Sequence, residues 1–155
     1  MRSLKVILAG AILGSAAVAS HAQTIFVDHF HKVTVSPYIQ ATFIEGSDES
    51  VTINNALVDA KKLHVEVHGE TLRIYLDGAK DFPKNLRGQD SRGDQQDYPL
   101  YPDHALSVTI SYRDLDAISL RGAETYLCKS PISTNSFTIR LYGEAKVTLT
   151  KVEVS

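Results

Sequence analysis

Apolar and polar residues alternate along most of the chain beyond residue 32. A period of two places successive side chains on opposite faces of a strand, so one face of each segment is expected to be buried and the other solvated. No segment has the sustained 3.6-residue period of an amphipathic helix. The pattern therefore predicts an all-β protein. Its apolar positions are Val33, Val35, Ile39, Ala41, Phe43, Val51, Ile53, Leu63, Val65, Val67, Leu72, Ile74, Leu76, Leu106, Val108, Ile110 and Tyr112.

A short motif occurs twice near the end of the chain. Residues 118–122, Ile-Ser-Leu-Arg-Gly, recur 21 positions later as residues 139–143, Ile-Arg-Leu-Tyr-Gly. Each copy is followed by a second alternating stretch, at 124–128 and at 145–149. A fixed repeat of this length is typical of chains that lay short strands over one another, each turn covering the apolar face of the last. The repeat predicts a solenoid-like stack.

Turn-forming residues separate several of the alternating segments. Gly69-Glu70 predicts a tight hairpin between the segments ending at Val67 and beginning at Leu72, and residues 45–48 predict a second turn. Residues 54–62 are compatible with a single helical turn, which is too short to change the fold class.

Residues 77–105 interrupt the alternation. This segment is rich in Gly, Pro and Asp, and it predicts a polar excursion from the fold, without strands of its own. Long excursions from small domains are commonly functional, so this one is the first candidate binding surface.

The first 22 residues have the pattern of a signal peptide. Arg2 and Lys5 precede the apolar run 6–19, and Ser20-His21-Ala22 offers small residues at the positions that a signal peptidase reads. We expect cleavage before Gln23, with cleavage after Ala19 as the alternative. An uncleaved anchor is the less favoured interpretation, because the apolar run is shorter than a bilayer requires.

Residues 23–155 are accordingly expected to form one extracytoplasmic domain with no integral membrane segment, in the periplasm, on the outer surface or secreted. The formal net charge of −2 becomes −4 when Arg2 and Lys5 are removed, and no basic cluster indicates nucleic-acid binding. Cys128 is the only cysteine, so an internal disulfide is excluded. Its place in an alternating stretch predicts a buried free thiol.

Several segments together resemble a known family. They are residues 29–35 (His-Phe-His-Lys-Val-Thr-Val), residues 38–43, the hairpin 63–74, and residues 106–112 with Leu115, Ile118 and Gly122. Over most of residues 26–155 the chain resembles the head GIN domain of putative auto-transporter adhesins, an exported domain of unknown function common in Bacteroidetes. The resemblance implies a right-handed β-helix-like solenoid of short strands with an N-terminal hairpin region. Relatives are expected to carry further glycine-marked turns beyond Ser155.

Candidate metal ligands are few. His64, Glu66 and His68 share one face of a predicted strand, and His29 and His31 form a second same-face pair. Four carboxylates lie in the excursion, at Asp90, Asp94, Asp97 and Asp103, but their spacing does not match a calcium loop. A solvated polar face explains both groups more simply, so we predict no metal site and no cofactor.

Four residues of the excursion are the predicted ligand-binding residues: Arg92, Asp94, Tyr98 and Tyr101. Arg92-Gly93-Asp94 spells a tripeptide that host-cell receptors recognise, and the two tyrosines could form an aromatic platform for a sugar ring. The alternative is that the tyrosines pin the excursion onto the domain.

No motif joins a nucleophile to a base, and Asp114, Asp116 and Glu124 fall at predicted corners, so no catalytic residue is predicted. The sequence therefore favours a non-catalytic exported adhesin-like or surface-assembly module that recognises a cell-surface glycan or protein. The alternative is a small secreted glycan-active enzyme or its degenerate relative. Because alternation continues to the last residues, self-association through the edge formed by residues 145–155 is also expected.

Overall fold

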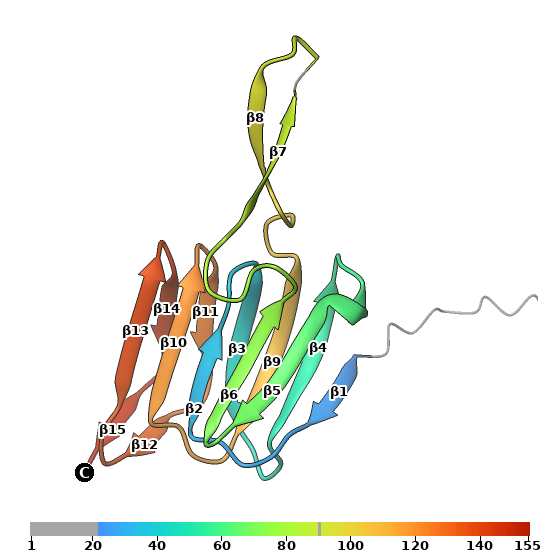
Figure 1. Ribbon diagram of the computed structural model, residues 1–155. Coiled ribbons are helices and arrows are strands. Elements are labelled where there is room, and N and C mark those ends of the chain that lie inside the picture. The colour runs from blue at the N-terminus through green and yellow to red at the C-terminus, as the bar shows by residue number, and fades with distance from the viewer. Residues whose placement is uncertain (1–21, 90) are drawn as a thin grey trace, which may run out of the picture.

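The computed structural model describes residues 22–89 and 91–155, and it confirms the all-β class. Two larger sheets lie one behind the other, and a narrow hairpin projects beyond them (Figure 1). The strands are β1 (Gln23–Phe26), β2 (Lys32–Val35), β3 (Ile39–Glu45), β4 (Ser50–Ala56), β5 (Leu63–His68), β6 (Thr71–Leu76), β7 (Asn85–Gln89), β8 (Gln95–Pro99), β9 (Leu106–Tyr112), β10 (Ala117–Gly122), β11 (Thr125–Cys128), β12 (Ile132–Thr134), β13 (Thr138–Gly143), β14 (Lys146–Leu149) and β15 (Val152–Val154).

The six-stranded sheet has the order β1-β4-β9-β3-β11-β14, and the five-stranded sheet has the order β13-β10-β2-β6-β5. Alternation decides which face of each strand is buried: β9 alternates strictly between buried and half-buried positions, and β6 does the same in the other sheet. The buried positions form one core between the sheets, in which Phe43, Leu72, Ile74, Ile110 and Leu120 are fully enclosed.

The 21-residue repeat is a structural repeat. β10 pairs in parallel with β13, with Ile118 opposite Ile139 and Gly122 opposite Gly143. β11 pairs in the same way with β14, and β12 with β15. Three consecutive strands are thus repeated at the expected step, each on its predecessor. The finer description, a right-handed β-helix-like solenoid, stays a prediction.

The antiparallel pairs all lie before β10. β5 and β6 form the expected hairpin, and Gly69 at its turn has a φ of 61°, a left-handed conformation that glycine adopts without steric cost. β4 runs antiparallel to β9 and β1 antiparallel to β4. The single helical turn expected within residues 54–62 is a 3-10 turn at Ala60–Lys62.

The prediction that the excursion lacks strands was wrong. β7 and β8 pair with each other across five residues and form the projecting hairpin of Figure 1. Their side chains show no burial alternation, because the ribbon rests on no second layer. A strand exposed on both faces needs no apolar period, so the pattern that located the other strands was absent here.

Cys128 is a buried free thiol opposite Leu149, as predicted. The predicted signal peptide lies, apart from Ala22, outside the described residues. Within the described ranges, no helix has the length and hydrophobicity needed to cross a bilayer.

Candidate functional site

A groove of about 550 Å³ lies at the base of the projecting hairpin. Its walls come from five connections: the link between β2 and β3, the loop between β6 and β7, the loop between β8 and β9, the β10–β11 corner and the β13–β14 corner. The two corners are equivalent positions of the 21-residue repeat, so stacking of the repeats places them side by side. The sequence therefore builds this groove from segments more than 100 residues apart.

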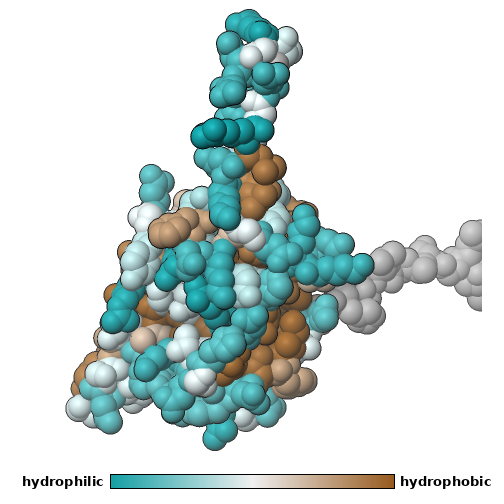
Figure 2. All heavy atoms as spheres, in the orientation of Figure 1, coloured by the Kyte–Doolittle hydropathy of each residue, from teal (hydrophilic) through white to brown (hydrophobic). Residues whose placement is uncertain are grey.

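Most of the groove's lining is apolar and aromatic. Phe82 has 74% of its surface exposed, and Tyr142, which also lines the groove, has 48% exposed. Pro37, Pro83 and Pro99 complete the apolar surface. Figure 2 shows apolar side chains gathered where the hairpin meets the body, below a largely hydrophilic tip. Exposed rings beside polar groups are a common means of holding a ring-shaped or apolar ligand group.

Glu124 forms a buried wall of the groove, with only 5% of its surface exposed. Its Oε1 accepts the backbone N–H of Tyr38 at 2.8 Å, and its Oε2 accepts that of Ala123 at 2.9 Å. Burial raises the pKa of this carboxyl above its usual value, although the backbone hydrogen bonds oppose the shift. Glu124 thus holds the β2–β3 link against the β10–β11 corner.

Two stacked glycines let these corners approach each other. Gly122 has a φ of 112°, and a Cβ there would collide with the Glu124 carboxylate. Gly143 has a φ of 81°, and its Cβ would lie 2.7 Å from the carbonyl oxygen of Gly122. Both positions therefore require glycine for conformation and for space.

An arginine cluster borders the groove. Arg121 and Arg73 each place a terminal guanidinium nitrogen 2.6 Å from the same Asp81 carboxylate oxygen. The Arg121 guanidinium also lies 5.3 Å from the centre of the Tyr142 ring, in cation–π contact. Arg121 and Tyr142 occupy equivalent positions of the repeat.

The four predicted ligand-binding residues do not come together. Arg92 and Asp94 lie in the turn between β7 and β8, at the tip of the hairpin, and both are exposed. Tyr98 is on β8, where its ring covers Gly88 and its hydroxyl donates to Gln96 Oε1 at 3.0 Å. Pro99, next to Tyr98, reaches the groove.

Tyr101 lies apart from the other three, below the hairpin. It is 94% buried, donates a hydrogen bond to the Asp77 carbonyl at 2.7 Å and meets Tyr38 edge-on. These contacts fasten the end of the excursion to the body, which is the alternative role considered for the tyrosines. Tyr98 and the tip residues stay candidates for ligand contact.

The histidines are distributed among separate carboxylates. His64 pairs with Asp77 and stacks on Tyr75 with 4.6 Å between ring centres, whereas His68 pairs with Glu66. In the part of the chain that the structure describes, no three His, Cys, Asp or Glu side chains are grouped to hold a metal ion.

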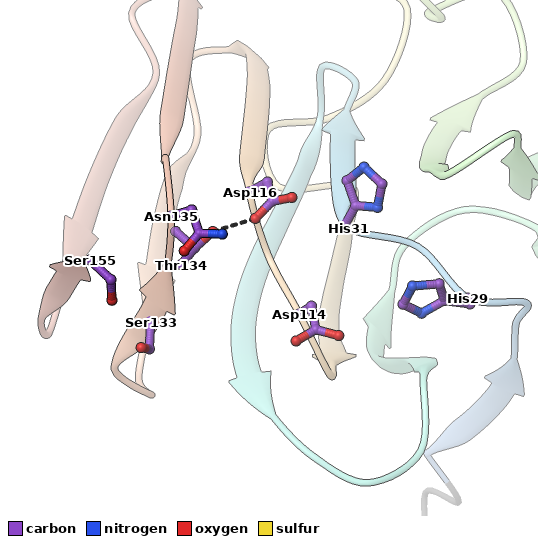
Figure 3. A pocket seen from close by; sticks show the side chains of 8 residues that line it. All are labelled: His29, His31, Asp114, Asp116, Ser133, Thr134, Asn135 and Ser155. Carbon is purple, nitrogen blue, oxygen red and sulfur yellow. Dashed lines mark hydrogen bonds between the residues drawn. The ribbon is translucent and has the colours of Figure 1, made fainter.

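A second, polar pocket of about 440 Å³ lies at the opposite end of the strands (Figure 3). His29 and His31 line it, and they face Asp114 and Asp116 across the opening. Three of these four groups are already engaged by a neighbour: His29 binds Glu49 at 2.8 Å, His31 binds Glu70 at 3.2 Å, and Asp116 accepts a hydrogen bond from Thr134. The pocket lacks an apolar surface, so the groove is the stronger candidate.

Sequence reasoning missed four groove residues: Phe82, Arg121, Glu124 and Tyr142. The repeat contains a signal for two of them, because Arg121 and Tyr142 precede the two repeated glycines and must therefore be neighbours. A second signal is the charged Glu124, which stands at a position where the second copy of the repeat has Ala145.

These features define an all-β domain with a projecting hairpin and a groove at its base. A family model described as "Putative auto-transporter adhesin, head GIN domain" matches residues 29–155, and the chain belongs to this family. The predicted resemblance is therefore confirmed. A search of curated proteins found no match.

Solved structures share the fold at low sequence identity. A putative adhesin from Bacteroides fragilis NCTC 9343 has a TM-score of 0.65 and 15% identity, with 86% of this chain and 54% of that chain covered. A putative adhesin from Parabacteroides distasonis ATCC 8503 has a TM-score of 0.56 and 19% identity, with 86% and 51% covered. A putative adhesin from Parabacteroides merdae ATCC 43184 has a TM-score of 0.52 and 14% identity, with 83% and 51% covered. This chain spans about half the length of each.

Proposed function

We propose that this chain is a non-catalytic, extracytoplasmic recognition module that binds a cell-surface glycan or protein in the groove at the base of the hairpin. In this proposal a right-handed β-helix-like stack supplies the rigid support, and the hairpin tip with Arg92 and Asp94 supplies a second contact. A rigid scaffold that presents loops is a common arrangement for binding sites.

The observation that carries the proposal is the combination of groups in the groove. Phe82 and Tyr142 both line the groove and present rings to solvent, and Asp81, Asp103, Glu144 and Arg121 line it as well. Rings that stack on the apolar face of a sugar, beside charged groups that bind its hydroxyls, are suited to a glycan. The same rings would also serve as anchors for a peptide. We prefer the glycan because charged side chains that can bind sugar hydroxyls stand beside the exposed rings.

Two observations support an extracytoplasmic site of action. Residues 1–22 have the charge and hydrophobicity pattern of a signal peptide, and the family name refers to auto-transporter adhesins. Both concern export, and neither depends on the groove.

The role of Glu124 favours binding over catalysis. A glycan-active enzyme needs an acid and a second carboxylate on either side of the scissile bond. Glu124 is the buried carboxyl of the groove, and both of its oxygens accept backbone N–H groups, which assigns it to holding the corner. The alternative, a small secreted glycan-active enzyme or its degenerate relative, would require Glu124 to leave these hydrogen bonds.

The test is a glycan-array screen of the mature domain, followed by titration of the retained glycans against Phe82→Ala and Tyr142→Ala. Each substitution removes a ring from the groove and should weaken binding about tenfold or more. Phe26→Ala is the matched control, because Phe26 on β1 is 73% exposed but lies outside the groove.

Equal loss of binding in the Phe26 and Phe82 variants would exclude the groove as the binding site. Steady release of reducing sugar from a retained glycan, abolished by Glu124→Gln, would favour the enzyme instead.

A further inference from the structure

The outer face of the five-stranded sheet carries a row of polar side chains across four adjacent strands. Strand register places Arg140 of β13 beside Ser119 of β10, Ser119 beside Thr34 of β2, and Thr34 beside Arg73 of β6. Alternation turns Thr34, Arg73 and Ser119 away from the core, because the residues on either side of each are buried, and register places Arg140 on the same face as Ser119. Two arginines therefore face solvent across a floor of two hydroxyl groups.

The small side chains of this floor leave a shallow hollow of about 280 Å³. Lys32, Arg121, Arg140 and Tyr142 stand around it, above Thr34 and Ser119. Arg121 and Tyr142 line both this hollow and the groove at the base of the hairpin, so the two are continuous. An extended ligand could occupy both.

Positive charge predominates around the hollow. Among the described residues, neither Lys32 nor Arg140 forms an ion pair with a carboxylate. Glu66 stands beside Arg73 in the sheet, but its oxygens accept hydrogen bonds from Tyr75 and pair with His68. Asp81 is then the one carboxylate engaged with the arginines, against four cationic side chains in a chain whose net charge is −2.

Asp81 shows that this cluster can hold a carboxylate. Its carboxylate is held by Arg73 and Arg121 together, and a planar guanidinium binds an oxyanion strongly. The contact leaves the arginines incompletely satisfied, because the buried Nε atoms of Arg73 and Arg121 have no hydrogen-bond partner within the described structure. Asp81 itself is half exposed and belongs to the loop that leads to the hairpin.

We infer that this face binds an acidic saccharide, with a carboxylate or sulfate group held over Ser119 by Arg121, Arg140 and Lys32. The hydroxyl floor binds sugar hydroxyls and the Tyr142 ring lies against the sugar. Asp81 is the resident carboxylate that competes with the ligand for Arg121. This inference rests on the proposed recognition of a glycan and assigns its chemical class.

The experiment compares two ligands that differ only in charge: an oligogalacturonate of six sugars and its fully methyl-esterified form. The native domain should bind the charged oligosaccharide about tenfold or more tightly than the ester, because each charged hydrogen bond is worth about that factor. Added salt should weaken the binding of the charged form, since exposed charges are screened. A sulfated hexasaccharide and its desulfated form repeat the comparison for sulfate.

Arg140→Gln is the main variant, because no described ion pair depends on Arg140. It should abolish most of the preference for the charged ligand and leave the thermal stability unchanged. Arg113→Gln is the matched control: it removes the same charge from an exposed position before β10, outside the hollow. Equal effects of the two substitutions, or none from Arg140→Gln, would overturn the inference.

Asp81→Asn tests whether Asp81 competes with the ligand for Arg121 or instead holds the arginines in position for binding. If Asp81 competes with the ligand, the variant should bind the charged oligosaccharide more tightly, and an unchanged or weaker affinity would overturn this role. Inorganic sulfate tests whether the saccharide is required, and binding of sulfate alone as tight as that of the sulfated hexasaccharide would overturn that requirement.

Phe82→Ala distinguishes this inference from the proposed function. It should weaken the binding of the charged and the esterified ligand equally, whereas Arg140→Gln should weaken the binding of the charged ligand only.

Discussion

The backbone N–H of Tyr38 donates a hydrogen bond to Glu124 Oε1 across 2.8 Å, which joins residues 86 positions apart. Tyr38 itself has a φ of 69°, a left-handed conformation that is uncommon for a non-glycine residue. The hydrogen bond holds this conformation, and the second oxygen of Glu124 holds the next corner through Ala123. The shape of the groove therefore depends on one buried carboxylate.

The ionisation of Glu124 should make the stability of the domain depend on pH. Folding raises the pKa of this carboxyl, chiefly through burial. A folded-state pKa above the unfolded one means that Glu124 favours folding most below about 4.5 and that this contribution is lost as the pH rises through the raised pKa. Replacement by Gln removes the titration. The unfolding free energy of Glu124→Gln minus that of the native chain should therefore be larger, meaning a relatively more stable variant, near pH 7 than near pH 4.

Urea unfolding at the two pH values measures this difference. Glu144→Gln, at an exposed position of the same groove, is the charge-matched control and should show a smaller change between them. The same dependence in both variants would mean that Glu124 is not the titrating group.

Gly143 should tolerate alanine less well than Gly69. Both have a positive φ, which costs about 1–2 kcal/mol for a residue with a Cβ. A Cβ at Gly69 would meet no atom within 4 Å, whereas at Gly143 it would lie 2.7 Å from the Gly122 carbonyl oxygen. Gly143→Ala should therefore cost more than Gly69→Ala by at least about 1 kcal/mol, measured by chemical denaturation. Equal costs would show that the corner relaxes freely.

Local patterns in the sequence predicted the core strands well because each of these strands buries one face. Val33, Phe43, Ile74 and Ile110 all lie at alternating positions and are all buried. The 21-residue repeat also predicted that the second copy stacks on the first, and in the structure Ile118 lies opposite Ile139. Alternation can be read within one strand, and the repeat within about 30 residues. Both patterns exist because the buried face of each strand must carry apolar side chains.

The order of the strands in the sheets and the residues of the groove could not be predicted from the sequence. β9 lies between β3 and β4, although β3 and β4 follow each other in the chain, and no local pattern encodes that insertion. The hairpin formed by β7 and β8 has no buried face and left no period to detect. The groove combines Phe82 with Glu124 and Tyr142, and only the stacking of distant corners brings them together.

Cys128 should react slowly with thiol reagents while the protein is folded. The side chain is 99% buried, and burial raises the pKa of the thiol, so little thiolate is present at neutral pH. Labelling should be fast in urea and slow in buffer. Rapid labelling of the folded chain would contradict this placement.

Replacement of Cys128 by Ser should be mild for a buried position. The sulfur donates a hydrogen bond to the Ser130 carbonyl at 3.3 Å, and a serine hydroxyl can make the same bond. We expect a cost near 1 kcal/mol, the lower end of the range for a polar group placed in a core. Cys128→Ala leaves that carbonyl without the donor and is the comparison. A Ser variant less stable than the Ala variant would refute the shared hydrogen bond.

The hairpin should be dispensable for folding. Its strands pair with each other only, whereas Lys84 at its base accepts hydrogen bonds from Leu100 and Tyr38 through its carbonyl. Replacing residues 86–98 by two glycines keeps these contacts, and closing a shorter loop changes the free energy by only about 0.6 kcal/mol per doubling of length. The variant should unfold cooperatively at nearly the native temperature while losing any binding at the tip. A non-cooperative transition would show that the hairpin is structural.

The side of the molecule formed by β13 and β14 should mediate self-association or accept a strand from a partner. β13 and β14 are the outermost strands of the two larger sheets, and in the described structure nothing pairs with their outer edges. Ile139 and Leu141 continue the buried column of Ile118 and Leu120, yet they are 38% and 45% exposed. Core-type side chains beside unpaired backbone groups are typical of an edge that binds another strand.

Leu141→Lys tests this edge, because it places a charge among the exposed apolar side chains without entering the closed core. Leu141 is preferable to Val147, which is half-buried against the core. The molar mass measured by light scattering should rise with concentration for the native chain. For Leu141→Lys it should stay at the value of the monomer. Leu86→Lys is the matched control, since Leu86 on the hairpin is 54% exposed and lies away from the edge. A native chain that stays monomeric at every concentration, with backbone amides of β13 and β14 protected from exchange, would refute an open edge.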